Sequence, residues 1–96
     1  MTMAETTDVI DRAERSRFEL VIDGHIAFAA YHRDGNVLTF THTIVPQALA
    51  GQGMGSKLIG GALAQVRARG ETIVAQCSFV AAYLAKHPEQ ADLISG

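Results

Sequence analysis

The apolar residues of this 96-residue chain change their spacing once, near Pro46, and that change limits the folds open to it. Before the proline, apolar and polar residues alternate with period two, which is typical of half-buried strands. Residues that favour tight turns, Asp23-Gly24 and Asp34-Gly35-Asn36, separate the runs. The first half therefore predicts an antiparallel meander of three strands, at residues 17–23, 25–34 and 37–45. We expect the second strand to present Ile26, Phe28 and Ala30 on one face.

After the proline the apolar spacing becomes helical. One stripe predicts a helix that Gly70 ends, and it comprises Leu58, Ile59, Ala62, Leu63 and Val66. Residues 72–77 then predict a short buried strand, and Ser78 is a candidate N-cap for a second helix, at 79–87, before Pro88. A helix between the third and fourth strands makes those strands parallel, with a right-handed connection. The fold class is therefore α+β, a mixed sheet with helices packed on it.

Length, charge and cysteine content exclude several classes of protein. Ninety-six residues make one domain, which we place at 17–96 after a polar segment at 1–16 that is either a frayed tail or a short edge element. A net charge of -2 gives no basic surface for nucleic acid. The single cysteine forms no internal disulfide, and there is no apolar stretch for a signal peptide or membrane span. We expect a cytoplasmic location and no membrane partner.

Three alternating glycines lie where the second half begins, in VPQALAGQGMGSKL at residues 45–58. The first N–H groups of a helix lack intrahelical partners, and a Ser, Thr, Asp or Asn side chain usually caps one of them. No such residue occurs between Val45 and Gly55, so backbone donors remain for an external anion, typically a phosphate. The alternative is structural, because glycines also serve tight loops and close packing of a helix on a sheet.

Two well-known nucleotide motifs fail at this turn. The dinucleotide fingerprint GxGxxG requires a third glycine where Ser56 stands, and no acid ends the following strand to hold a ribose. The nucleoside triphosphate motif GxxxxGK[ST] requires glycine directly before lysine, whereas Ser56 separates Gly55 from Lys57. A phosphate ligand of another class is therefore favoured.

Four segments resemble the GCN5-related N-acetyltransferases, in particular very small proteins that consist of little more than the acetyl-CoA site. They are RFEL, FTHTIVP, GQGMGSKL and CSFVAAYLAKHPE, and together they extend from about Arg17 to Leu93. The family motif [RQ]xxGx[GA] at a helix start is matched except at its first position, where Ala50 stands. A side-chain contact to the pyrophosphate is therefore missing, and backbone donors must replace it.

This resemblance implies acetyl-CoA as cosubstrate and an unidentified amine as acceptor. It implies that the pantetheine arm lies between two parallel strands that splay apart, here 37–45 and 72–77, with backbone N–H groups near Ile44 and Val45 facing the thioester. Where the small relatives often carry an acid, this chain has Ile44, so this strand offers no carboxylate base. The predicted cofactor-binding residues are Ile44, Val45, Ala50, Gly51, Gln52, Gly53, Met54, Gly55 and Ser56.

Three side chains are candidates for proton transfer. His42, near the end of the third strand, has an imidazole that could accept the amine proton, or it is a solvated or hydrogen-bonded strand histidine. Cys77 precedes a helix N-terminus and could protonate the CoA sulfur or accept the acyl group, although free cysteines commonly pack as small apolar residues. The resemblance implies that Tyr83, on the last helix, lies in a region where larger relatives carry a tyrosine that acts as an acid; the alternative is a core residue with a hydrogen-bonded hydroxyl. No pair of histidines has metal-ligand spacing, so we expect no metal.

Three functions remain open from the sequence. The first is an acetyl-CoA-dependent N-acetyltransferase that acts by direct attack of an amine. The second is a non-catalytic acyl-CoA-binding or regulatory module, favoured by Ile44 and by the small size of the domain. The third is an anion-binding interaction domain. The acceptor and the oligomeric state are not specified by the sequence.

Overall fold

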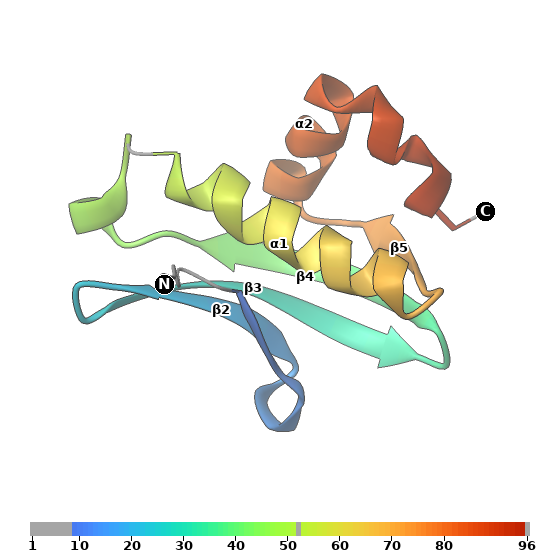
Figure 1. Ribbon diagram of the computed structural model, residues 1–96, viewed down its shortest axis with the longest axis horizontal. Coiled ribbons are helices and arrows are strands. Elements are labelled where there is room, and N and C mark those ends of the chain that lie inside the picture. Colours follow the sequence, from blue (N-terminus) through green and yellow to red (C-terminus); the bar gives the residue numbers. More distant parts are fainter. Residues whose placement is uncertain (1–8, 52, 96) are drawn as a thin grey trace, which may run out of the picture.

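A computed structural model describes residues 9–51 and 53–95, which form one mixed sheet with two main helices on it (Figure 1). The sheet order is β1-β2-β3-β4-β5, antiparallel from β1 to β4 and parallel between β4 and β5. The predicted α+β class and the parallel crossover are therefore confirmed. The strands are β1 (Ile10–Arg12), β2 (Arg17–Ile22), β3 (His25–Asp34), β4 (Val37–Ile44) and β5 (Thr72–Ala75). The helices are η1 (Ala13–Arg15), η2 (Gln47–Leu49), α1 (Met54–Ala68), α2 (Ser78–Lys86) and η3 (Pro88–Leu93), where η marks 3₁₀ turns.

The core lies between one face of the sheet and both α-helices. Helix α1 buries its predicted apolar stripe, and all five of its members are inaccessible to solvent. Phe18 and Phe40 from the sheet, and Val80 from α2, belong to the same buried cluster. Because one continuous core includes both α-helices, these two lie on the same side of the sheet, and the opposite side carries no α-helix among the described residues.

The face of strand β3 that packs against the core carries its smaller side chains rather than its larger ones. Ile26, Phe28 and Ala30 do share a face, but the buried residues are Ala27, Ala29 and Tyr31. Small residues fit here because α1 packs closely over β3. The larger Ile26 and Phe28 instead lie on the face away from α1 and α2, which we call the outer face.

Strand β4 contains one extra residue relative to β3. Tyr31 pairs with Phe40 while its neighbour Ala30 pairs with His42, so Thr41 is bulged out of the ladder. A bulge of this kind reverses the alternation of faces along the strand. Phe40 and Thr43 therefore both point toward the helices, whereas alternation without a bulge would place them on opposite sides.

The observed element boundaries correct three predictions. Strand β4 ends at Ile44, so Val45 lies just beyond it, and β5 ends at Ala75, two residues before Cys77. The N-cap of α2 is Cys77, and Ser78 is the first helical residue; no side chain caps this helix. The shift has a physical cause, because the N–H groups of Gln76 and Cys77 both donate to the Phe40 carbonyl, which bends the chain out of the strand.

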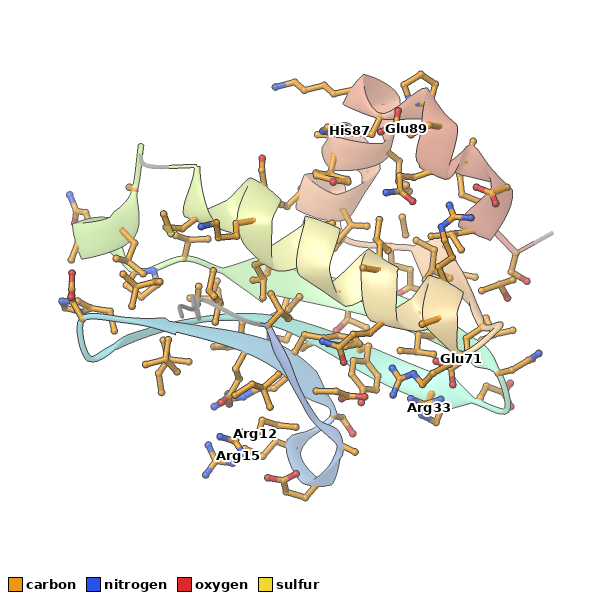
Figure 2. All side chains as sticks on the ribbon, viewed as in Figure 1. Arg12, Arg15, Arg33, Glu71, His87 and Glu89 are labelled. Atoms are coloured by element: carbon orange, nitrogen blue, oxygen red, sulfur yellow. The ribbon has the colours of Figure 1, made fainter. Side chains whose placement is uncertain are left out.

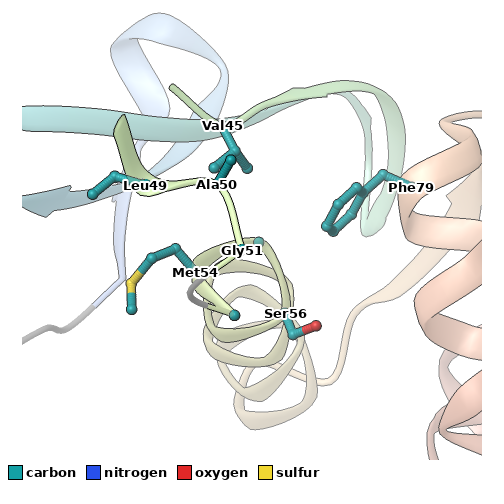
Figure 3. A pocket seen from close by; sticks show the side chains of 9 residues that line it. Val45, Leu49, Ala50, Gly51, Met54, Ser56 and Phe79 are labelled. Atoms are coloured by element: carbon teal, nitrogen blue, oxygen red, sulfur yellow. The ribbon is translucent and has the colours of Figure 1, made fainter. Parts of the chain in front are cut away.

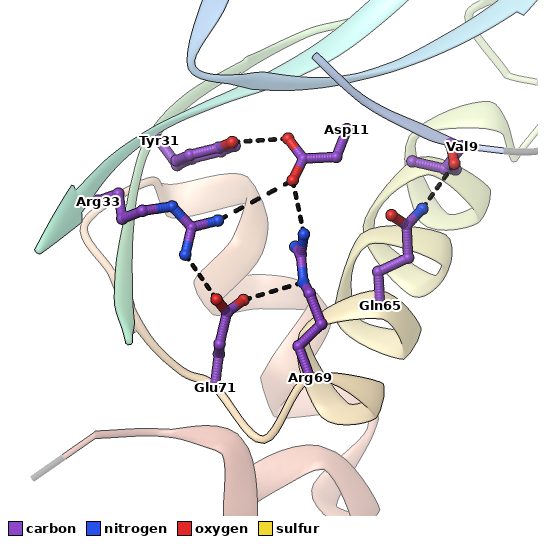
Figure 4. A network of polar contacts seen from close by, with 7 residues as sticks. All are labelled: Val9, Asp11, Tyr31, Arg33, Gln65, Arg69 and Glu71. Carbon is purple, nitrogen blue, oxygen red and sulfur yellow. Dashed lines mark hydrogen bonds and ion pairs between the residues drawn. The ribbon is translucent and has the colours of Figure 1, made fainter. Parts of the chain in front are cut away.

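Edge strand β1 is held against the end of α1 by a polar network (Figure 4). Asp11 accepts a hydrogen bond from Tyr31 at 2.6 Å and one from Arg69 at 2.9 Å. Glu71 pairs with Arg33 at 2.5 Å and with Arg69 at 3.2 Å. The sequence analysis left two alternatives for the N-terminal segment, a frayed tail or an edge element. Residues 9–16 supply an edge strand, β1.

A second cluster of charge lies on the outer face. The Glu19 carboxylate is almost fully buried beneath Arg17, Arg12 and Arg15, whose nitrogens lie at 2.6, 3.4 and 3.6 Å. Figure 2 shows Arg12 and Arg15 together on the side of the sheet away from the helices. Burial raises the pKa of the Glu19 carboxyl, but the three arginines together outweigh it and the net pKa is lowered.

Candidate functional site at the start of helix α1

A cavity of about 300 Å³ opens where β4 ends and α1 begins (Figure 3). Its walls come from the turn between these elements, from the first residues of α1 and from Phe79 of α2. Figure 3 shows Phe79 reaching toward the start of α1 from the side opposite Leu49 and Ala50. The lining residues are Val45, Leu49, Ala50, Gly51, Gly53, Met54, Gly55, Ser56 and Phe79.

Two of the glycines are required by the shape of the turn. Gly51 and Gly53 have φ angles of +79° and +73°, in the left-handed region that side chains disfavour. A Cβ at either position would meet no atom within 4 Å, so both backbones face open space. Gly53 is the N-cap of α1, and no side chain caps the helix. The first N–H groups of α1 have no intrahelical acceptor, and the residues that carry them, Gly53 to Ser56, line the cavity.

The third glycine has a different reason. Gly55 is buried at the start of α1, and a Cβ built on it would overlap the Phe79 ring at Cζ. The Phe79 side chain is still 39% exposed, although α2 holds its backbone close to α1. An aromatic ring thus stands at the border of the cavity, in contact with the helix start, with one side open to solvent.

Strands β4 and β5 part next to this cavity. Their pairing extends from Val37 with Thr72 to Phe40 with Ala75 and includes none of residues 41–44. The β4 edge beyond Phe40 is therefore available to an extended ligand, which can bind there as an added strand does. Cys77 lies at the parting point, 6% exposed, with its Sγ 3.3 Å from the Thr43 hydroxyl.

His42 lies on the other side of the sheet. Its ring packs edge-on against Phe28 at 5.9 Å, and its Nδ1 is 3.3 Å from the Thr41 hydroxyl. Phe28 belongs to the outer face, whereas Cys77 joins the core on the helix side. The two candidates for proton transfer therefore flank the same open segment of β4 from opposite faces.

Tyr83 lies apart from both of them, in the groove between α1 and α2. Its ring stacks on His87 with centroids 4.1 Å apart, and it lines a second, smaller cavity rather than the first. Burial, and then the nearby Glu89 carboxylate, raise the pKa of the Tyr83 hydroxyl. The hydroxyl therefore keeps its proton at neutral pH.

The structure brings together most of the residues that the sequence indicates for cofactor binding. Gln52 lies outside the described residues, and Ile44, which is 48% exposed, lies outside the cavity on the outer face. The sequence analysis missed Leu49 and Phe79 as lining residues. Phe79 is an apolar residue in a predicted helix, and such a position does not by itself indicate a cavity wall. Only the packing of α2 beside α1 brings its ring to the cavity. The predicted residues found in the lining are Val45, Ala50, Gly51, Gly53, Met54, Gly55 and Ser56.

Within the described ranges, no three His, Cys, Asp or Glu side chains are grouped closely enough to bind a metal ion. Over the same residues, no helix has the length and apolar character that crossing a membrane requires.

Comparisons with known proteins agree with this geometry. The model of the GCN5-related N-acetyltransferase family matches residues 17–93. A GCN5-like N-acetyltransferase candidate from Staphylococcus aureus, solved in solution by NMR, is similar in structure, with a TM-score of 0.71 and 27% sequence identity over 96% of this chain and 91% of that one. No curated protein matches. Because the family model covers most of the chain, this protein belongs to the GCN5-related N-acetyltransferase family.

Proposed function

We propose that the protein binds acetyl-CoA at the start of α1 and transfers the acetyl group to an amine. The observation that carries the proposal is the cavity itself, where an uncapped helix start and two open left-handed glycines coincide with a parted strand edge. The first feature suits a pyrophosphate and the second suits an extended, amide-containing arm. Family membership supports the acyltransfer class.

The residues present fit the cofactor. Backbone donors from Gly53 to Ser56 would hold the pyrophosphate, since Ala50 supplies no side-chain contact. The edge of β4 near Ile44 and Val45 would hold the arm, and the apolar side chains of Leu49, Met54 and Phe79, which line the cavity, would pack against it. In such a complex the coenzyme supplies an activated thioester. The cytoplasmic location expected from the sequence stays part of this proposal.

Transfer forms a C–N bond, breaks a C–S bond, removes a proton from the amine and delivers one to the sulfur. Because CoA binding fills the helix side, we place the acceptor on the outer face, where the His42 imidazole can take the amine proton. Cys77, on the helix side at the parting of the strands, can return a proton to the sulfur. Thr43 fixes the position of the Cys77 thiol at 3.3 Å. Tyr83 is a second candidate acid, and its position in the second cavity makes it less well placed than Cys77.

A second function is favoured by one observation. Ile44 is exposed on the outer face, so the acceptor side carries no carboxylate at this point, and neither α-helix lies on that face. An acyl-CoA-binding module without turnover would need the cavity and no acceptor site. Release of free CoA from acetyl-CoA in the presence of a panel of amines separates the two functions. Only an enzyme would raise this release above the rate measured in buffer without protein.

Binding is tested by substituting Gly53 with residues that differ in charge alone. Asn and Asp are similar in size and both tolerate positive φ better than other residues with side chains. Both are also good N-caps, so both should preserve the fold. We expect Gly53→Asp to abolish the thermal shift produced by acetyl-CoA, because its carboxylate repels the pyrophosphate, while Gly53→Asn retains a reduced shift.

The comparison ligands are CoA, ATP and NAD. Stabilisation by the two CoA compounds, without equal stabilisation by ATP or NAD, is the expected result. If acetyl-CoA does not stabilise the wild-type protein, both the enzyme and the binding module are excluded. If Gly53→Asp and Gly53→Asn respond alike, the ligand is bound but its phosphates are not at the start of α1.

A further inference from the structure

The outer face of the sheet exposes several large apolar side chains. An antiparallel sheet can leave one face in water, and that face is then usually polar. Six large apolar residues are exposed among the described ones, and four of them lie on this face, namely Ile10, Val21, Ile26 and Ile44. The register brings them together, because Val21 pairs with Ile26, and Ile44 pairs with Phe28. Exposed apolar residues that gather on one face mark a surface for a binding partner.

Positive charge is in excess at the end of this face near β1. The single buried carboxylate of Glu19 is surrounded by three guanidinium groups, those of Arg12, Arg15 and Arg17. The exposed Glu14 of the adjoining turn adds one carboxylate, which still leaves the arginines in excess. In the network of Figure 4, by contrast, two arginines face two carboxylates. The cluster on the outer face therefore has the charge to bind a further anion.

Two of these arginines have donors left for such an anion. Arg12 and Arg17 lie directly opposite each other in the ladder, and like charges in that position are unfavourable by themselves. Arg17 donates from Nε to Glu19 at 2.6 Å, and Arg12 is nearest to Glu19 through its own Nε, at 3.4 Å. The terminal nitrogens of both arginines form no hydrogen bond with another described residue. A guanidinium presents these nitrogens as a planar pair, which matches the two oxygens of a carboxylate.

A line of side chains joins these arginines to His42, the proposed base. The Arg17 guanidinium lies over the Phe28 ring at 4.3 Å, and that ring meets the His42 ring edge-on at 5.9 Å. The register agrees, because Arg17 and His42 pair with the same residue of β3, Ala30. Two strand spacings, about 10 Å, therefore separate Arg17 from His42. This distance is about one Debye length, so solvent screens the repulsion between the arginines and an amine at His42.

The combination of charge and apolar surface favours a polypeptide as the acceptor. A nucleic acid would pair with the arginines, but its phosphates would gain nothing from exposed isoleucine and valine side chains. A free amino acid is too short to reach from the base to the arginines. An extended peptide advances about 3.3 Å per residue, so about three residues span that distance. Its neighbouring apolar side chains can pack on the exposed apolar residues of the outer face.

We propose that the acceptor is a polypeptide that docks on the outer face, with its amine at His42 and an Asp or Glu carboxylate, about three residues away, at Arg12 and Arg17. The inference rests on the proposed function, since it names the class of acceptor for the same site. It makes Arg12 and Arg17 specificity-determining residues, which select an acidic residue near the modified amine.

The test uses two pairs of fluorescein-labelled peptides with blocked ends, one lysine and flanking valines. The members of a pair carry glutamate or glutamine at one position, which is three residues before the lysine in one pair and three residues after it in the other. Fluorescence anisotropy measures their affinity for the protein saturated with CoA, so the readout does not require turnover. In at least one pair, we expect the wild type to bind the glutamate peptide about fivefold more tightly, as for a strong exposed ion pair.

Arginine variants show whether the preference arises at the outer face. Arg12→Gln and Arg17→Gln should each bring the affinity ratio within a pair close to one. Arg67→Gln is the matched control, because it removes an arginine that pairs with Asp92 on the helix side, and it should keep the wild-type ratio. A variant that is merely less stable would weaken both peptides of a pair alike, so the ratio separates recognition from folding.

Other outcomes would overturn the proposal. A ratio near one in the wild type for both pairs, or a fivefold ratio that survives in Arg12→Gln and Arg17→Gln, would remove the docking site while the proposed function stands. Loss of the ratio in Arg67→Gln as well would show a long-range charge effect in place of a contact. Absence of a thermal shift with CoA, in a protein that is folded by circular dichroism, would overturn the proposed function itself.

Two further measurements exclude other occupants of this face. Tighter binding of a single-stranded oligonucleotide than of any of the peptides would overturn the assignment to a polypeptide. A dimer in analytical ultracentrifugation that Ile26→Glu dissociates would overturn it as well, because a second copy of the chain would then cover the outer face.

Discussion

The ring of Phe79 rests on Gly55 so closely that the glycine has no room for a Cβ. This contact joins the first turn of α2 to the first turn of α1, directly beside the candidate cofactor cavity. It also predicts an unusual response to a substitution that normally strengthens a helix.

Gly55→Ala should displace the Phe79 ring into the cavity mouth and weaken acetyl-CoA binding, even though alanine favours a helix by up to about 1 kcal/mol. In a Phe79→Ala background the overlap is gone, so the same substitution should raise the free energy of unfolding. The four proteins form a double-mutant cycle that is measured by urea denaturation and by titration with CoA. Additive effects of the two substitutions would show that the contact does not couple the helices.

The two faces of the open β4 segment predict separable effects on turnover. His42→Ala should lower the rate of CoA release in the presence of a good amine by about 100-fold or more, as for the loss of a general base. His32→Ala is its control, because His32 pairs with Thr39 on β4, before the strands part. Similar rates for His42→Ala and His32→Ala would remove His42 from the mechanism.

Cys77→Ala should lower turnover while leaving the affinity for CoA nearly unchanged, since the thiol lies at the strand gap and does not line the cavity. Cys77→Ser, which keeps a hydroxyl near Thr43, should retain more activity than alanine does. Steady-state kinetics with each variant separates kcat from KM. A Cys77→Ala variant with wild-type kcat would leave the residue a purely structural role.

The cluster around Glu19 predicts a pH dependence of stability. Because the folded protein lowers the pKa of this carboxyl, the unfolded chain binds the proton more readily, and stability rises with pH across that interval. The contribution of Glu19 is therefore complete above about pH 5 and is lost as the pH falls through the lowered pKa. Urea midpoints of the wild type should exceed those of Glu19→Gln at pH 7, with a gap that shrinks at acid pH.

The exposed Glu14 provides the comparison for this measurement, because it lies in the adjoining 3₁₀ turn. Glu14→Gln should follow the wild type across the pH range. A gap between the wild type and Glu19→Gln that stays constant down to pH 3 would contradict the assignment of the effect to Glu19 ionisation.

The network at the sheet edge predicts that Asp11→Asn destabilises the protein by about 1–3 kcal/mol, since Tyr31 and Arg69 lose a charged acceptor. Asp92→Asn removes a carboxylate that pairs with Arg67 at 2.7 Å but is 61% exposed, and it should leave the unfolding curve unchanged. Both variants are compared by urea denaturation at neutral pH. Equal effects would show that burial does not distinguish the two ion pairs.

Local patterns were sufficient for the meander, the apolar stripe of α1 and the uncapped glycine turn, because each depends on neighbours within a few residues. The core face of β3 was not predictable, since Ala27 and Ala29 are buried only because α1 packs closely against them. The same holds for the contact of Phe79 with Gly55, which joins two helices. The glycine pattern indicates where backbone groups lack covering side chains, whereas the side chains that surround this backbone are set by tertiary packing.

The bulge at Thr41 directly follows the last residue of β4 that pairs with β5, Phe40. Deletion of Thr41 would restore a regular ladder, because Phe40 already pairs with Tyr31 and His42 already pairs with the neighbouring Ala30. His42 would therefore stay on the outer face and Thr43 on the side of Cys77, whereas the local bend and twist that a bulge adds to the strand would be lost. A one-residue deletion could thus test whether the gap between β4 and β5 depends on that bend, because it removes none of the side chains that are proposed to bind or react.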